Sequence, residues 1–201
     1  MVSLSGNNGP YASLPDCDTL LPREVLDAIP GTDGERAEGE YRGPDDLDDA
    51  SRPLENGPLG RLSCGADIRD GADALLVTVS IFEPHADDPE AADELTGFLA
   101  DRSRERTEIW EEEAFDQLLD RPVGGWREIG VGEFGFVGLL DDTDRGSSSQ
   151  VVVVEYVTDN LWVRTLYRTE DPQDEAESYR YAERFAQRLD RRIAREAEPA
   201  G

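Results

Sequence analysis

The chain has 201 residues, which is enough for one domain with a hydrophobic core but short for two. It contains 46 acidic residues against 20 basic ones, and the resulting formal net charge is −26. This charge excludes nucleic acids, which need a basic surface, and opposes binding to anionic bilayers. No apolar run reaches the roughly 18 residues of a membrane span, so we expect a soluble monomer that does not itself insert into a membrane.

The N-terminal quarter combines a polar tail, a short helix and an acidic segment. Residues 1–12 predict a disordered tail in front of one domain over residues 13–198. Apolar residues from Leu20 to Ile29, with Pro22 in the first turn and Pro30 at the stop, predict a short helix. Residues 31–58 hold few apolar side chains and many acids, so we expect a mobile acidic loop there whose deletion leaves the fold intact.

The rest of the chain alternates hairpins with helices. Alternating apolar residues predict a β-hairpin over 61–68 and 74–82, and later strands near 126–131, 134–140, 151–157 and 161–168. Helices are predicted from Asp88-Pro89 onward, continuing or resuming as far as Leu119, and from Asp171-Pro172 to the C-terminus. We therefore expect an α+β fold, with a largely antiparallel sheet of about six strands and helices packed against it.

Two cysteines, Cys17 and Cys64, are present. A disulfide is favoured because it would close the long loop between a helix start and a strand, where few residues can form a core. Two buried thiols remain the main alternative. A zinc site or a cysteine nucleophile is disfavoured, because His85 is the single histidine in the chain and no C-x-x-C pair occurs.

Other motifs give weak signals. The G-x-G-x-x-G match at 130–135 runs into a predicted strand, so it indicates turns between strands and no dinucleotide site. Asp141, Asp142 and Asp144 form a weak candidate for a divalent cation, and the acids at 45, 46, 48 and 49 a weaker one. His85 is interpreted as a solvated loop residue, and Trp110, Trp126 and Trp162 as core. We expect no catalytic residues and no cofactor.

Short motifs in the chain resemble a group of actinobacterial envelope lipoproteins of unknown function. The opening Leu14-Pro15-Asp16-Cys17 leads into a short helix, and Cys64 begins the first hairpin; a turn at 129–134 precedes the hairpin over 151–167. The chain is also similar to the extracellular sensor domains of some mycobacterial kinases. The resemblance implies a Cys17–Cys64 disulfide, an α+β sheet and export by a lipoprotein signal or anchor, neither of which this chain carries.

Together these observations predict a non-catalytic, extracytoplasmic binding or sensing module of the cell envelope, either envelope-bound or secreted. Its partner would be an unknown envelope protein or a small ligand. Two alternatives stay open: a cytoplasmic acidic adaptor with free thiols, and a carboxylate-dependent hydrolase.

Overall fold

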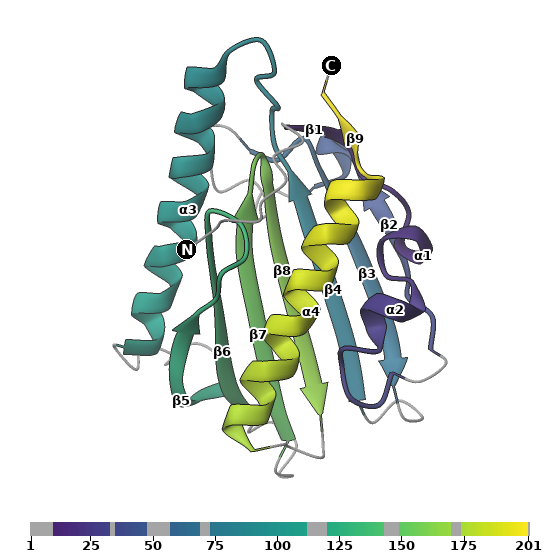
Figure 1. The fold of residues 1–201 in the computed structure, drawn as a ribbon, viewed down its shortest axis with the longest axis vertical. Helices are drawn as coiled ribbons and strands as arrows, with labels where there is room; N and C mark the ends of the chain where they lie inside the picture. Colours follow the sequence, from purple (N-terminus) through teal and green to yellow (C-terminus); the bar gives the residue numbers. More distant parts are fainter. Residues whose placement is uncertain are drawn as a thin grey trace.

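A computed structural model of the chain describes residues 10–32, 35–47, 57–68, 73–111, 120–142, 149–169 and 174–200. Within these ranges, seven strands form one antiparallel sheet in the order β2-β3-β4-β8-β7-β6-β5 (Figure 1). In that order the strands are β2 (Glu38–Arg42), β3 (Gly60–Ile68), β4 (Asp73–Ile81), β8 (Leu161–Thr169), β7 (Ser149–Thr158), β6 (Phe134–Asp142) and β5 (Asp120–Glu128). A small separate sheet pairs β1 (Tyr11–Ser13) with β9 (Glu198–Pro199) and so joins the two ends of the domain.

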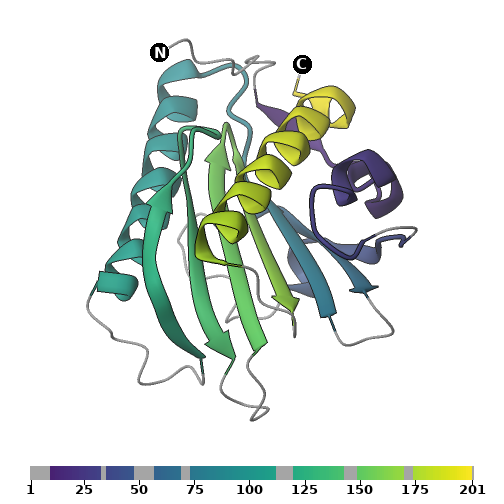
Figure 2. The ribbon, with the colours of Figure 1, turned by 60° about the horizontal axis from the view of Figure 1, so that its bottom comes forward.

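The helices cover both faces of the large sheet. The long C-terminal helix α4 (Glu175–Glu196) crosses one face, and the short helices α1 (Cys17–Leu20) and α2 (Arg23–Leu26) pack beside it (Figures 1 and 2). On the opposite face, α3 (Pro89–Glu111) packs against β5, β6 and β7. This arrangement confirms the predicted α+β fold with a largely antiparallel sheet.

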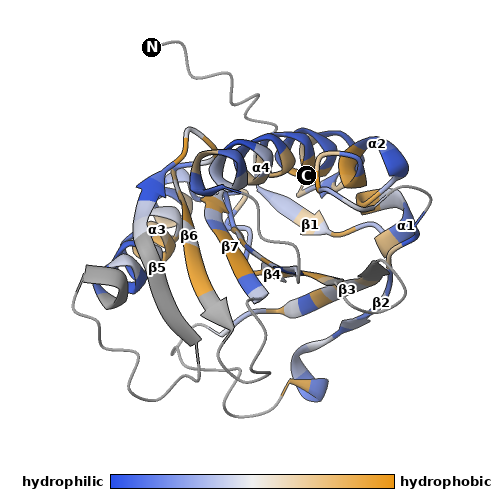
Figure 3. Ribbon diagram, turned by 90° about the horizontal axis from the view of Figure 1, so that it is seen from below, coloured by the Kyte–Doolittle hydropathy of each residue, from blue (hydrophilic) through white to orange (hydrophobic). Residues whose placement is uncertain are grey.

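The core is built from apolar residues at helical spacing in α4 and at alternate positions in the strands. On α4 the apolar residues that recur at 3-4 spacing are buried against the sheet: Tyr179, Ala182, Ala186, Leu189 and Ile193. The alternating residues of β4 meet the same core, because successive side chains of a strand point to opposite faces. Figure 3 shows the outer side of α4 in blue and the strands β6 and β7 largely in orange, as expected for a helix that buries one stripe.

The face under α3 has smaller apolar clusters. Leu99 is fully buried and packs with Phe82, Val157 and Trp162, while Phe98 on the same helix is 41% exposed. The cluster holds the middle of α3 close to the ends of β4 and β7, and a pocket lies next to it.

The first helical segment differs from the expectation. The predicted helix from Leu20 to Ile29 is split into α1 and α2, because Pro22 has an extended backbone and starts a new helix. The carbonyl of Pro22 accepts hydrogen bonds from the amides of Val25 and Leu26, so proline acts as the N-cap of α2. A proline cannot donate the backbone hydrogen bond needed inside a longer helix.

The acidic segment 31–58 contains more structure than a mobile loop. It contributes β2, which pairs with β3 in register from Glu38↔Gly65 to Arg42↔Arg61, and a 3-10 turn at Pro44–Asp46. Ala37 and Leu47, which flank these elements, are buried. The loop expectation was wrong for this part, and β2 is the reason why the sheet has one strand more than the six expected. Residues 33–34 and 48–56 lie outside the described ranges.

Three boundaries also differ from those expected. Tyr11 belongs to β1 and is 2% exposed, although residues 1–12 were expected to be a disordered tail; residues 1–9 lie outside the described ranges. Strand β5 begins at Asp120, earlier than expected, and the predicted helix beyond Glu111 lies in residues 112–119, outside the described ranges. The N-cap of α4 is Asp174, whose side chain accepts a hydrogen bond from the amide of Glu177.

Candidate functional site

A disulfide between Cys17 and Cys64 ties the start of α1 to the middle of β3. The two Cα atoms are 5.6 Å apart, and both side chains are buried. The predicted disulfide is therefore present, and the alternatives of two thiols, a zinc site or a thiol nucleophile do not apply to these sulfurs. A bridge across 47 residues restricts the unfolded chain and stabilises the fold by about 4 kcal/mol in the entropy model.

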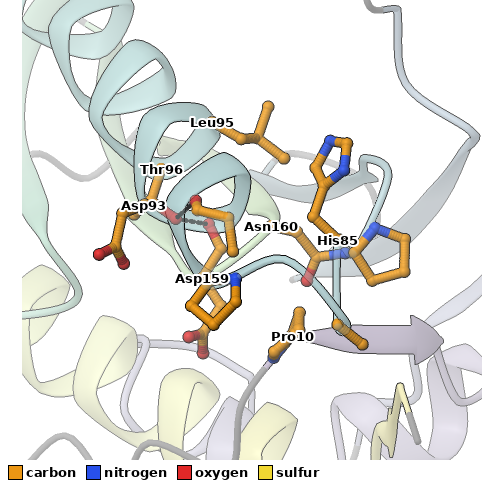
Figure 4. A pocket seen from close by; sticks show the side chains of 11 residues that line it. Pro10, His85, Asp93, Leu95, Thr96, Asp159 and Asn160 are labelled. Atoms are coloured by element: carbon orange, nitrogen blue, oxygen red, sulfur yellow. Dashed lines mark hydrogen bonds between the residues drawn. The ribbon is translucent and has the colours of Figure 1, made fainter.

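A pocket of about 230 Å³ opens between the first half of α3, the loop after β4 and the β7–β8 hairpin (Figure 4). We call it the His85 pocket. Its apolar lining comes from Pro10, Pro84, Pro89, Ala92 and Leu95. Its volume is below the roughly 300–1,000 Å³ of typical ligand pockets, so it suits a small molecule with an apolar body.

Asn160 holds three segments of the chain together at the base of this pocket. Its side-chain oxygen accepts a hydrogen bond of 2.8 Å from the Tyr11 amide. Its side-chain nitrogen donates to the carbonyl oxygens of Tyr11, at 2.9 Å, and Phe82, at 2.7 Å. The side chain is 2% exposed, so these bonds are shielded from water. The Asn160 side chain therefore links the β7–β8 hairpin to the N-terminal strand and to the residue that follows β4.

Two residues at the pocket have a backbone conformation that L-residues seldom adopt. His85 has φ 46° and Asp159 has φ 49°. Non-glycine residues in this left-handed region are uncommon and cluster at turns and functional sites. His85 is half-buried in the pocket wall, whereas the sequence suggested a solvated loop residue.

The polar side chains that line the pocket are the His85 imidazole, the carboxylates of Asp93 and Asp159, the Thr96 hydroxyl and the Asn160 amide. The Thr96 hydroxyl lies 2.9 Å from the carbonyl oxygen of Ala92 and 3.0 Å from that of Asp159, and these two acceptors share its single proton, which joins α3 to the hairpin. The Asp159 carboxylate points toward α4 in Figure 4. Burial raises the pKa of Asp159, and the nearby charge of Glu133 raises this pKa further. The Asp93 carboxylate is exposed and points away from His85 in Figure 4, so the imidazole of His85 is the group left to contact a ligand.

The weak cation candidates gain no support. Asp141 and Asp142 end β6, but their side chains and the whole of Asp144 lie outside the described residues. Asp45 and Asp46 are exposed in the 3-10 turn. Within the part of the chain that the structure describes, no group of three or more His, Cys, Asp or Glu residues is arranged to hold a metal ion.

The glycine motif at 130–135 forms a turn between β5 and β6. Gly132 has φ 66°, and a Cβ atom there would lie 2.0 Å from the carbonyl oxygen of Val157. Strand β6 follows directly, as expected from the sequence. Trp126 packs edge-on against Phe134 and Phe136, which agrees with a core role; the side chain of Trp110 lies outside the described residues.

Glu155 is a buried charge that the sequence analysis did not identify. It is 1% exposed, accepts a 2.9 Å hydrogen bond from the Ser103 hydroxyl, and lies 3.3 Å from Arg106 and 4.0 Å from Arg164. Burial raises its pKa, and the two arginines and the hydroxyl oppose that shift. The signal was a single acid inside the apolar strand β7. Its contacts are all with protein groups between α3 and the sheet, which indicates a structural role.

A second, more open cavity of about 480 Å³ lies between α2 and α4. It is lined by Arg188, Arg191, Arg192 and Arg195 together with acidic residues of α2. Arg188 donates to the carbonyl oxygen of Glu24 at 2.7 Å, and Arg192 donates to that of Thr19 at 2.7 Å. These arginines therefore attach α1 and α2 to α4.

Comparisons with known proteins support the fold and leave the ligand open. No protein-family model and no curated protein matches the chain. Among solved structures, the extracellular domain of PknH from Mycobacterium tuberculosis is similar, with a TM-score of 0.50 and 9% identity over 90% of this chain and 99% of that one. An uncharacterized protein from Mycobacterium smegmatis, the Rv0999 ortholog, aligns with a TM-score of 0.36 and 10% identity over 90% of this chain and 97% of that one.

The expected similarity to extracellular domains of mycobacterial kinases is thus confirmed at the level of the fold, and no specific family follows from it. None of the helices among the described residues has an apolar stretch long enough to cross a bilayer.

Proposed function

We propose that this chain is a non-catalytic, extracytoplasmic binding or sensing domain of the cell envelope. The Cys17–Cys64 disulfide is the observation that carries the proposal. Disulfides form and persist in oxidising compartments and are rare in the reducing cytosol. This one is buried, with Cys17 5% and Cys64 0% exposed, so it belongs to the folded core. A cytoplasmic adaptor would need both sulfurs as free thiols.

The His85 pocket is the proposed binding site. Three segments distant in sequence meet there, and two of its residues have the left-handed backbone that is enriched at functional sites. The apolar lining would bind the body of a small ligand, and the His85 imidazole would contact its polar group. The fold similarity to a domain described as extracellular is consistent with this function.

The compartment is tested on protein recovered from its native host. Cells are lysed in an alkylating agent without reductant, and the intact mass is compared before and after reduction. We expect no alkylation until a reductant is added, and then modification of both cysteines. Alkylation of Cys17 and Cys64 in the unreduced sample would contradict the extracytoplasmic assignment.

The binding site is tested with a blocked pocket. A panel of small molecules is screened by NMR against isotopically labelled protein, and we expect ligands to shift the signals of His85 and Thr96. Ala92→Trp would fill the pocket and abolish these shifts, whereas Glu94→Trp, on an exposed position of the same helix, would leave them intact. Binding that survives Ala92→Trp would place the site elsewhere.

A further inference from the structure

We infer that the cavity between α2 and α4 is a second binding site, which takes the phosphate group of a soluble small molecule. This site is separate from the His85 pocket, because the two share no lining residue. Helices α2 and α4 pack together on one face of the sheet, whereas α3, which lines the His85 pocket, covers the opposite face (Figure 1). The inference therefore goes beyond the proposed function and can be tested without it.

The cavity brings together four positive side chains of α4. They recur at the i, i+3, i+4 and i+7 spacing that places residues on one side of a helix: Arg188, Arg191, Arg192 and Arg195. The acidic lining residues are Glu24 and Asp27, so the wall carries four positive and two negative charges. Arg23 and Glu196, which pair with lining residues from outside the wall, add one charge of each sign. The excess of two positive charges matches the charge of about −1.5 to −2 on a phosphate group at pH 7.

Two of the arginines are held in place by contacts with α1 and α2. Arg188 donates a 2.7 Å hydrogen bond to the carbonyl oxygen of Glu24, and Arg192 donates one of 2.7 Å to that of Thr19. The side chain of Arg192 is only 16% exposed. These contacts fix part of the cationic wall in advance, and groups that are already ordered lose less freedom when a ligand binds.

Arg191 has no such structural contact. It is exposed and acts electrostatically on the neighbouring Asp190, but among the described residues it forms no hydrogen bond and no ion pair. The helix dipole does not account for it, because the dipole favours cations in the last turn and Arg191 lies more than one turn before the end of α4. Its N–H donors are therefore available to a ligand. A guanidinium presents these donors as a planar fork that fits the oxygens of a phosphate.

The Glu24 carboxylate competes with an anion for the same guanidinium groups. It lies 3.6 Å from a nitrogen of Arg192 and 3.6 Å from a nitrogen of Arg195. Its side chain is 68% exposed, so it can move out of the cavity without opening the core. A singly charged carboxylate ligand would only replace Glu24, whereas a phosphate has a second charge and further oxygens with which to bind Arg191 as well.

The size of the cavity indicates that the phosphate belongs to a small molecule. Its volume of about 480 Å³ falls within the roughly 300–1,000 Å³ of typical ligand sites and leaves room for the group that carries the phosphate. A bilayer is a poor source of this phosphate, because the net charge of −26 repels an anionic membrane surface.

The test is a titration with inorganic phosphate at pH 7.5 and constant ionic strength, followed by NMR of the arginine Nε–Hε groups. We expect saturable shifts for Arg191 and its neighbours Arg188 and Arg195, and no saturable shift when NaCl replaces phosphate. Arg191→Gln should weaken phosphate binding about tenfold, as expected for the loss of a hydrogen bond between charged groups. Arg180→Gln removes the same charge from an exposed position about three turns earlier on α4, and it should change the affinity by less than about twofold.

A second pair of variants tests the competition with Glu24. Glu24→Gln removes the competing carboxylate and should raise the affinity for phosphate about threefold, as expected for an exposed ion pair. Glu94→Gln removes the same charge from an exposed position on α3 and should leave the affinity unchanged. Far-UV circular dichroism establishes that each variant is folded, and Arg191→Gln changes an exposed side chain without a structural contact.

Phosphate shifts that do not saturate, or equal losses of affinity in Arg191→Gln and Arg180→Gln, would overturn the inference, because the net charge alone would then explain the effect. Glycerol phosphate and vesicles that contain phosphatidic acid separate the two sources of a phosphate group. We expect glycerol phosphate to shift the same arginine signals and the vesicles not to retain the protein. Retention on vesicles that is lost in Arg191→Gln would contradict a soluble ligand.

Discussion

Gly39 shows how a missing side chain allows the disulfide to be covered by β2. A Cβ atom at this position would lie 1.9 Å from the carbonyl oxygen of Ser63 and 2.8 Å from the sulfur of Cys17. Both distances are too short for real contacts, and the first involves backbone that cannot move alone. We predict that Gly39→Ala lowers the free energy of unfolding by about 1–3 kcal/mol, because β2 must shift away from β3 to make room for the added methyl group, and urea denaturation measures this change.

Gly97 provides a matched control for this substitution. It lies inside α3, and a Cβ atom there would meet nothing within 4 Å. Gly97→Ala should therefore stabilise the protein by about 0.5–1 kcal/mol, because alanine is the better helix former. If Gly39→Ala were as stable as the wild type, β2 would not be packed on the disulfide in the way described.

The helices and strands that could be predicted from the sequence are those whose apolar residues recur at a regular spacing. The 3-4 spacing from Tyr179 to Ile193 placed α4 on the sheet correctly, and the alternation in β4 identified its buried face. Strand β2 gave no such signal, because all five of its residues are exposed and its place at the edge is set by backbone pairing with β3. Edge strands with charged side chains resist pairing with other chains, and the same charges hide them from pattern analysis.

Most of the candidate site could not be predicted from the sequence, because it is formed by tertiary contacts and not by a local pattern. The His85 pocket combines Pro10, the segment from Pro84 to Thr96, and the hairpin at Asp159-Asn160, which are far apart in the chain. The hairpin over 151–167 was predicted, but the three hydrogen bonds of Asn160 depend on tertiary contacts with β1 and Phe82. The cysteine pair could be predicted, because a disulfide needs two particular residues and the chain has two.

The structure reverses the expectation that residues 31–58 can be removed without loss. Deleting them would take away β2, uncover Leu62 and Cys64 on β3, and remove the buried Ala37 and Leu47. We predict that this deletion lowers the thermal midpoint strongly or prevents folding, as measured by far-UV circular dichroism and calorimetry.

A substitution within β2 serves as the comparison for this deletion. Replacing Glu38 and Glu40 by threonine changes exposed side chains and keeps the backbone pairing with β3. We expect an effect within about 0.5 kcal/mol, as for ordinary surface changes. A deletion variant with a native-like spectrum and an unchanged midpoint would show that β2 contributes little to the sheet.

For the whole molecule, the dominant physical fact is a net charge of −26 on 201 residues. Arginines lie close to acidic residues at Glu155 and in the cavity between α2 and α4. The 20 basic residues cannot balance the 46 acidic residues of the whole chain. Repulsion among the excess negative charges is stronger in the compact folded state than in the expanded unfolded chain.

Self-repulsion predicts that salt stabilises this protein, although salt weakens individual ion pairs. The Debye length falls from about 30 Å at 0.01 M to about 3 Å at 1 M, so added NaCl removes the long-range repulsion first. We predict a gain of about 1–2 kcal/mol, or about 2–8 °C in the thermal midpoint, between these concentrations at pH 7.5. Near pH 4.2, the isoelectric point calculated from the sequence, the net charge vanishes and the salt effect should shrink with it. A midpoint that falls with salt at pH 7.5 would mean that specific ion pairs, such as those of Glu155, outweigh the repulsion of the excess charge.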